Sequence, residues 1–197
     1  MKRSFDLLSS LFGLILIAPV FIVLSILIKV NDKGPVFFKH KRVGKEGKLF
    51  TLYKFRTMRT SRFLERESFE PGDLSRVTFI GKFLRRTKLD ELPQLLNVLK
   101  GDMSIVGPRP EVEKWVAVYP ERWKLIHSIK PGITDNSSIV YRKEELLLAE
   151  SDDPEKTYKE IVMPRKLNLY EEYILNKSFF GDLKIILKTI FFLMFKK

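Results

Sequence analysis

An uncharged, mostly apolar run lies near the start of the chain, from Leu7 to Ile28. About 20 apolar residues are enough for a helix to span a bilayer. Basic residues lie on both sides of the run, with Lys2 and Arg3 before it and Lys29 and Lys33 after it. A signal peptide would have a shorter apolar run and a small-residue cleavage site. The pattern therefore predicts a retained membrane helix.

Pro19 lies near the middle of this run, where a proline removes a backbone hydrogen bond and kinks a helix. The basic residues on the two sides are balanced, so the positive-inside rule gives no direction of crossing. Two topologies fit these residues equally. One is a kinked helix that spans the membrane, and the other is a re-entrant helix that bends at Ala18-Pro19 and returns to the same face.

The C-terminal segment 179–197 is also apolar, with Lys184 and Lys188 four residues apart on one helical face. Another face collects Phe180, Leu183, Leu187, Ile190 and Phe191. This pattern is typical of a basic amphipathic helix in the headgroup region of a membrane. An ordinary packing helix has the same pattern, and both interpretations stay open.

Between these ends, residues 34–58 have the pattern of a β-hairpin, with strands at 36–38 and 49–56 joined by the turn residues 44–47. Period-two alternation puts one set of second-strand side chains on one face: Phe50, Leu52, Lys54 and Arg56. The other face receives Leu49, Thr51, Tyr53 and Phe55. Lys54 and Arg56 side by side would suit phosphate binding, although solvated charge at a strand end is the simpler explanation.

The rest of the chain reads as mostly helical, so the predicted fold class is α+β with one small β-hairpin. Residues 59–71 are polar and charged, and we expect a mobile surface segment there. Helices are predicted at 79–86, from near Leu92 to Gly101, at 113–128, and over 141–173 with a break near 152–154.

Asp90 and Glu91 come directly before the helix that is predicted to begin near Leu92, because Pro93 is tolerated only in a first turn. The positive end of a helix dipole stabilises a carboxylate and also favours a bound phosphate. A nucleophilic or metal-ligating carboxylate and an anionic substrate could therefore meet here. Adjacent acids that simply cap a helix are the commoner explanation.

A second candidate is the turn-rich stretch 101–110, which ends in Pro108-Arg109-Pro110. The prolines make this turn rigid, and the guanidinium of Arg109 suits forked recognition of phosphate oxygens. As a lone tripeptide it is weak evidence, and a surface loop would be the default.

Composition narrows the chemistry. The 197 residues include 36 Lys and Arg against 24 Asp and Glu, a net charge of +12, which favours polyanionic partners such as anionic lipid, phosphorylated substrate or nucleic acid. The chain has no cysteine, which excludes thiol chemistry, and only two histidines. We recognise no Walker phosphate loop, no Gly-x-Gly-x-x-Gly dinucleotide motif, no serine nucleophile elbow and no His-Glu-x-x-His zinc helix in the sequence. We also recognise no nucleic-acid-binding module.

The motifs together are specific. The chain resembles the bacterial sugar transferase family, the monotopic phosphoglycosyl transferases that start glycan assembly on undecaprenyl phosphate. The resemblance runs in order over nearly the whole chain and is carried by residues 2–6, 53–58, 81–94, 97–110, 130–134 and 182–184.

The resemblance implies two parts: residues 1–33 as a re-entrant membrane helix with its flanks, and residues 34–197 as a catalytic domain on the cytoplasmic face of the bacterial inner membrane, with the C-terminal amphipathic helix included. It implies transfer of a sugar 1-phosphate from a UDP-sugar to undecaprenyl phosphate. UMP would be released after Asp90 had formed a covalent sugar-phosphate intermediate.

The same resemblance implies the residues of the site. Asp90 and Glu91 would form the catalytic dyad, with Mg²⁺ held partly by Asp90. Glu91 would orient Asp90 or help to deprotonate the acceptor. Arg85 and Arg109 are the first choices for phosphate contacts, followed by Lys54 and Arg56, and Gln94 and Asn97 are either polar site groups or structural residues.

Three departures from the family pattern bear on recognition and topology. After Thr134, many family members continue with a glycine and an aromatic residue and then an Asn-Gly-Arg run, and residues 135–142 differ from this pattern. Leu175 stands where an acid is often found before the final helix. Both leave the donor sugar undetermined. Ala18 replaces a serine before Pro19, so the bend keeps its proline and loses a hydroxyl.

Two other function classes compete. One is a metal-assisted glycosyltransferase that moves the sugar alone and releases UDP. The other is a basic, membrane-anchored binding module for anionic lipid or nucleic acid, which would need neither the acidic pair nor the Pro-Arg-Pro turn. Self-association stays open.

Overall fold

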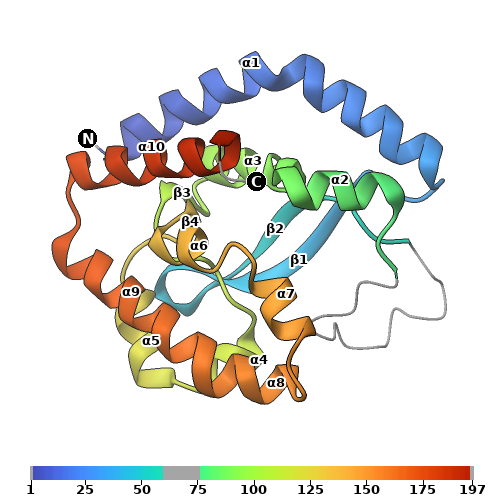
Figure 1. Cartoon of the computed structure of the whole chain (residues 1–197). Helices are drawn as coiled ribbons and strands as arrows, with labels where there is room; N and C mark the ends of the chain where they lie inside the picture. Colours follow the sequence, from blue (N-terminus) through green and yellow to red (C-terminus); the bar gives the residue numbers. More distant parts are fainter. Residues whose placement is uncertain (1, 60–75, 196–197) are drawn as a thin grey trace.

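The computed structural model describes residues 2–59 and 76–195. Its described part is mostly helical with two small sheets, which confirms the predicted α+β class. Helix α1 (Lys2–Asn31) arches over one side of the molecule, and α10 (Phe179–Phe195), α3 (Gln94–Lys100) and α2 (Phe79–Thr87) lie beneath it (Figure 1).

Helix α1 contains the predicted apolar run and is continuous through Pro19, although the ribbon curves between its two ends (Figure 1). Most of its apolar side chains face outward, among them Phe12, Ile15 and Leu16. Within the described residues it is the one helix whose length and composition would allow it to cross a membrane.

Both ends of α1 are attached to the same body. At the N-terminal end, Arg3 donates through Nη1 and Nη2 to the carbonyls of Val98 and Leu99 at 2.6 and 3.0 Å, which satisfies the last carbonyls of α3. The buried carboxylate of Asp6 accepts hydrogen bonds from the hydroxyl of Ser104 and the backbone N–H of Ile105, both at 3.0 Å.

At the C-terminal end of α1, Leu24 and Ile28 are buried in one cluster with Phe55 of the hairpin and Leu84 of α2. The side chain of Lys29 donates to the carbonyl of Gly34 at 3.2 Å. Both ends of α1 are therefore held by one body, and further along the helix Gly13 packs on Leu95 and Phe21 on Phe55.

The predicted hairpin is confirmed. Strand β1 (Phe37–Val43) pairs antiparallel with β2 (Leu49–Phe55), Phe37 opposite Phe55 and Val43 opposite Leu49. The 3₁₀ turn η1 (Lys45–Gly47) joins them, and Gly47 takes a φ of 72° that few side chains tolerate. Phe50 and Leu52 face a cluster with Val98 and Met103, whereas Phe55 faces α1.

The second sheet was not predicted. Strand β3 (Ser104–Val106) runs parallel to β4 (Gly132–Thr134). Gly107 and Gly132 touch backbone to backbone, because a Cβ on Gly132 would lie 2.1 Å from the nitrogen of Gly107. Only glycine allows this approach, so the two motifs 101–110 and 130–134 are joined here.

The prediction of one continuous helix at 113–128 is wrong. The structure has α4 (Glu113–Val116) and α5 (Pro120–Ile126), because Pro120 has no N–H for a continuous helix and instead begins a new one. The predicted region 141–173 contains α7 (Glu144–Ala149), α8 (Pro154–Thr157), the π-helical turn η3 (Tyr158–Val162) and α9 (Met163–Asn176), preceded by α6 (Asn136–Val140).

The break expected near 152–154 lies between α7 and α8 and is confirmed. Helix α10 buries Asp182 and Ile185 against the body and leaves Phe180, Leu187 and Phe191 exposed. The surface segment expected at 59–71 lies outside the described residues, except for Arg59.

Candidate active site

Asp90 and Glu91 lie on η2 (Leu89–Glu91), a single 3₁₀ turn between α2 and α3. Lys88 ends α2 in the left-handed conformation, with φ 57°, and so turns the chain sharply before the acidic pair. The placement directly before α3 is as predicted. The side chains of both residues are largely buried, so their charges need partners.

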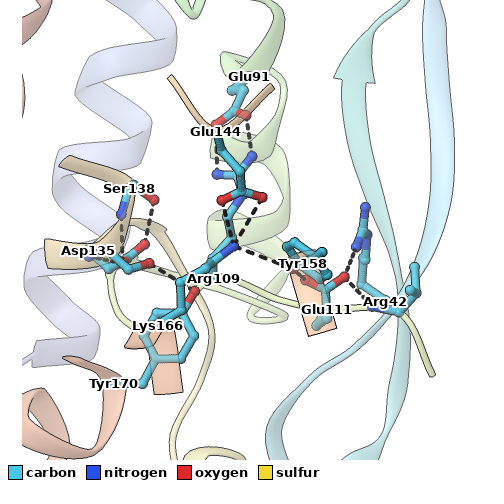
Figure 2. A network of polar contacts seen from close by, with 12 residues as sticks. Arg42, Glu91, Arg109, Glu111, Asp135, Ser138, Glu144, Tyr158, Lys166 and Tyr170 are labelled. Carbon is cyan, nitrogen blue, oxygen red and sulfur yellow. Dashed lines mark hydrogen bonds and ion pairs between the residues drawn. The ribbon is translucent and has the colours of Figure 1, made fainter. Parts of the chain in front are cut away.

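Glu91 is paired with two cations from distant parts of the chain. Lys54 of β2 donates to Oε1 at 2.9 Å. Arg109 donates to Oε1 through Nη2 and to Oε2 through Nη1, the latter at 3.2 Å (Figure 2). Burial opposes the charge of Glu91, but Arg109 and Lys54 outweigh it and hold the pKa of Glu91 well below its usual range. In return, Glu91 raises the pKa of Arg109.

Asp90 is in a different electrostatic state. Its Oδ1 is buried with no hydrogen-bond partner among the described residues, and burial raises its pKa, with Lys54 opposing and Glu91 reinforcing the effect. Two adjacent acids therefore have opposite pKa shifts, a pattern found where acids have different chemical roles. Asp90 is thus the acid of the pair that has an oxygen without a partner in the described part of the chain.

The turn at Pro108-Arg109-Pro110 is clamped to β4. The N–H of Gly107 donates to the carbonyl of Thr134 at 3.1 Å, and the N–H of Gly132 donates to the carbonyl of Pro108 at 2.9 Å. This turn brings Arg109 to Glu91, so the structure joins the two motifs that the sequence offered separately.

The contacts described for Arg56 and Arg85 are with residues other than Asp90 and Glu91. Arg56 pairs with Asp32, with Nη1 3.0 Å from Oδ2, and Arg85 donates through Nε to the hydroxyl of Thr57 at 3.1 Å. Lys54 and Arg56 have different acidic partners, Glu91 and Asp32, although the N–H of Arg56 still donates to the carbonyl of Val36 at 2.9 Å, in register with the β1–β2 pairing. Phosphate contacts by Arg56 and Arg85 stay predictions.

Asn97 and Gln94 are both buried in α3. The amide nitrogen of Asn97 donates to the carbonyl of Thr51 at 2.7 Å and to Asp102 at 3.2 Å, and its oxygen accepts from the N–H of Tyr53 at 3.0 Å. Asn97 thus has a structural role, in joining β2 to α3. Gln94 has a buried Nε2 with no partner among the described residues, which leaves it as a candidate polar group of the site.

A divalent cation would find one protein carboxylate here. The described residues contain no group of three or more acids or histidines that could hold a metal by themselves. Magnesium in phosphoryl-transfer sites is usually bound by one or two carboxylates together with substrate phosphates and water. The unpartnered Oδ1 of Asp90 fits that arrangement as a single ligand.

Sequence reasoning gave no role to a second polar cluster that attaches α1 to α10. Lys2 donates to the carbonyl of Val106 and to the hydroxyl of Tyr173, both at 3.0 Å, and forms an ion pair with Asp182. Tyr173 also donates to Asp182 at 2.7 Å. In the sequence, the only sign of this cluster was a charged residue, Lys2 or Asp182, near the start of each apolar segment.

The site is thus a buried acidic pair beside two basic side chains, on a turn that packs against the long apolar helix α1. The model of the bacterial sugar transferase family matches residues 1–196, and the chain belongs to that family. It is therefore an enzyme of the transferase class.

Several characterised or named bacterial proteins are similar to the chain. The "uncharacterized sugar transferase EpsL" of Bacillus subtilis is 38% identical over 190 residues, 96% of this chain and 85% of that protein. A UDP-glucose:undecaprenyl-phosphate glucose-1-phosphate transferase of Escherichia coli is 37% identical over 97% of this chain and 39% of its own length. A UDP-N-acetylgalactosamine-undecaprenyl-phosphate N-acetylgalactosaminephosphotransferase of Aeromonas hydrophila is 36% identical, over 96% of this chain and 42% of its own length.

Proposed function

We propose that the protein transfers a sugar 1-phosphate from a UDP-sugar to undecaprenyl phosphate and releases UMP. Family membership and the names of the Escherichia coli and Aeromonas hydrophila relatives support this class of reaction. The observation that carries the proposal is the buried Asp90 carboxylate, unpartnered at Oδ1 and adjacent to a Glu91 that two cations keep ionised.

In the proposed first step, a carboxylate oxygen of Asp90 attacks the β-phosphorus of the donor. A new oxygen–phosphorus bond forms, the bond from that phosphorus to the bridging oxygen breaks, and UMP leaves with the electron pair. The sugar phosphate is then held as an acyl phosphate diester on Asp90. Covalent catalysis of this kind divides one difficult transfer into two easier ones.

In the second step, a phosphate oxygen of undecaprenyl phosphate attacks the same phosphorus. The bond to Asp90 breaks, its carboxylate is regenerated, and undecaprenyl diphosphate sugar is the product. Arg109 and Lys54, which flank Glu91, would stabilise the negative charge on the phosphoryl oxygens. When bound at Asp90, Mg²⁺ would neutralise charge on the donor diphosphate and favour the ionised form of Asp90.

Glu91 is best suited to orient this site. Its carboxylate bridges Lys54 and Arg109 and so fixes both cations beside Asp90. Because these cations keep Glu91 ionised, it is a weak base at neutral pH while they stay bound. Deprotonation of the acceptor would therefore need Arg109 or Lys54 to move to the donor phosphates.

We further propose that α1 is re-entrant and that the body lies on the cytoplasmic face of the inner membrane. The support is geometric: Arg3 and Asp6 at one end of α1, and Leu24 and Ile28 at the other, are bound to one body. A helix crossing the membrane would place its ends on opposite sides, where one small body could not hold both. Pro19 lies in the part of α1 between these attachments.

Helix α10 would lie in the headgroup region beneath α1. Its outward side presents apolar residues, with Phe180 80%, Leu187 59% and Phe191 51% exposed. Lys184 is exposed beside them, as expected for a helix at an anionic surface. Its inner side packs on the body through Ile185, so the helix combines the two roles that the sequence left open.

The alternative function is transfer of the sugar alone, which would release UDP. The experiment that separates the two is analysis of the nucleotide released from a panel of UDP-sugars, with Mg²⁺ and undecaprenyl phosphate. UMP supports the proposal and the preferred sugar identifies the donor. UDP would support ordinary glycosyl transfer and contradict the role given to Asp90.

A further inference from the structure

Glu111 lies two residues after Arg109, separated from it only by Pro110. The proline ring fixes one backbone torsion of this short link, so the position of Glu111 constrains that of Arg109. An acid so close in sequence would also be a natural alternative partner for the guanidinium of Arg109. The structure prevents this competition, since Arg109 is paired with Glu91.

The carboxylate of Glu111 is occupied by three donors. Arg42 of β1 donates through Nη1 to Oε1 at 2.7 Å, the N–H of Val112 donates to Oε1 at 2.9 Å, and the hydroxyl of Tyr158 donates to Oε2 at 2.6 Å. The backbone carbonyl of Glu111 also accepts from the N–H of Val43 at 2.9 Å. Glu111 is therefore bound both by its side chain and by its main chain.

Figure 2 shows how this arrangement continues away from the site. Lys166 of α9, buried, donates to the Tyr158 hydroxyl at 3.4 Å and pairs with Glu144 of α7 at 3.1 Å. A series of contacts thus runs from α7 through α9 to Glu111 and ends next to the Arg109–Glu91 pair. The positive and negative side chains alternate along it, so each buried charge has an opposite neighbour.

We propose that Glu111, held by Arg42 and Tyr158, is a positioning residue for the proposed transfer reaction: it anchors the Pro108–Pro110 turn so that Arg109 faces Glu91 and the donor diphosphate. The other end of the turn is already fixed by the hydrogen bonds between Gly107, Pro108 and β4. Glu111 supplies the second anchor, without which Arg109 would sample positions away from Glu91. The inference rests on the proposed function, because it is the diphosphate that Arg109 would contact.

The test is a double-mutant cycle on the full-length protein, with Glu111→Gln, Arg109→Lys and the two together. If Glu111 acts through Arg109, Glu111→Gln lowers the turnover number about tenfold in the wild-type background and less than twofold in the Arg109→Lys background, where the forked contact is already lost. A merely structural role would lower turnover by the same factor in both backgrounds, and that result would overturn the proposal. No loss in the wild-type background would overturn it as well.

Tyr158→Phe is the second variant, for the case that Glu111→Gln does not fold. It removes the hydroxyl donor to Glu111 and the weak contact of that hydroxyl with Lys166, which keeps Glu144 as its partner, and we expect the same dependence on the Arg109 background. The matched control is Glu155→Gln, which removes an exposed ion pair with Lys114 on the same side of the molecule and should change neither turnover nor melting temperature.

The dissociation constant for UDP, measured by calorimetry on the same variants, separates this inference from the proposed function. If wild-type protein releases no UMP from any donor but the cycle shows coupling in UDP binding, the proposed function fails and the positioning role stands. If UMP is released and neither turnover nor UDP binding shows coupling, the positioning role fails and the proposed function stands.

Discussion

Arg109 donates hydrogen bonds through both of its terminal guanidinium nitrogens to the carboxylate of Glu91, which lies 18 residues earlier in the chain. The contact joins two turns that the sequence separates by a helix and a strand, and Lys54 completes it from the hairpin. Both cations bind Glu91, whereas the adjacent Asp90 has an oxygen with no hydrogen-bond partner within residues 2–59 and 76–195. The proposed division of labour between the two acids follows from this asymmetry.

Asp90→Asn should lower the turnover number by at least about 1,000-fold, because the amide cannot act as the nucleophile. Membrane association and melting temperature should stay close to those of the wild type, since Asp90 has no bonded partner at Oδ1 to lose. UMP release by purified variant and wild type measures the effect. Asp152→Asn, an exposed acid, is the control, and substantial residual turnover of Asp90→Asn would contradict the nucleophile assignment.

Arg109→Lys should reduce turnover about 10- to 100-fold, because an ammonium group cannot replace the forked contact. Arg109→Ala should also destabilise the fold by about 3 kcal/mol, since it leaves Glu91 buried with only Lys54 as a partner. Turnover and thermal unfolding in detergent give the two effects. Equal turnover in wild type and Arg109→Lys would contradict a phosphate-binding role for this residue.

The stability difference between wild type and Glu91→Gln should depend on pH. The folded-state pKa of Glu91 lies well below its usual value of 4.5, so its stabilising effect is fully present above about pH 4.5 and is lost as the pH falls through the folded pKa. Asp90 has the opposite shift, and Glu91→Gln relieves part of it, because the charge of Glu91 is one of its causes. The contribution of Glu91 to the difference in melting temperature should therefore begin to fall below about pH 4.5, and a difference that does not narrow between about pH 5 and pH 3.5 would contradict the assigned ionisation of Glu91.

Asn97→Ala should destabilise the protein by about 2–4 kcal/mol, because it removes three hydrogen bonds and leaves buried groups of β2 unpaired. The turnover of the folded fraction should stay near that of the wild type. Asn176→Ala, which removes one exposed side-chain hydrogen bond at the end of α9, is the control. A large loss of turnover with unchanged stability would restore Asn97 as a substrate-binding residue.

Cysteine labelling can test the topology of α1 cleanly, because the chain has no cysteine. Ser4→Cys and Lys33→Cys, introduced singly, place exposed thiols at the two ends of the helix. The re-entrant proposal predicts that a membrane-impermeant thiol reagent labels both in inside-out vesicles and neither in intact cells. Labelling of the two positions from opposite sides would show a spanning helix.

The sequence predicted the elements that depend on local pattern. The hairpin, the position of Asp90 and Glu91 shortly before a helix, and the break before Pro154 were confirmed, since alternation, proline and glycine determine them locally. The helix that was predicted wrongly has a local cause too, because Pro120 divides the segment 113–128 into α4 and α5.

The contacts between distant segments could not be derived from the pattern. Nothing local to Arg109 indicates that its partner is Glu91 and not Glu111, because that choice depends on Arg42 and Tyr158 occupying Glu111. Similarly, the parallel β3–β4 pair exists because two glycines from separate motifs meet. The resemblance to the family identified the acidic pair as a candidate site, and the structure showed which charged side chains surround it.

The central claim is that Asp90 carries the sugar phosphate, and the most direct test omits the acceptor. Purified enzyme with Mg²⁺, its preferred UDP-sugar and no undecaprenyl phosphate should release about one UMP per active site in a burst. Mass spectrometry should then find the sugar phosphate on the peptide that contains Asp90, and added undecaprenyl phosphate should remove it. UMP that appears only after the acceptor is added, with no modified peptide, would contradict the covalent mechanism.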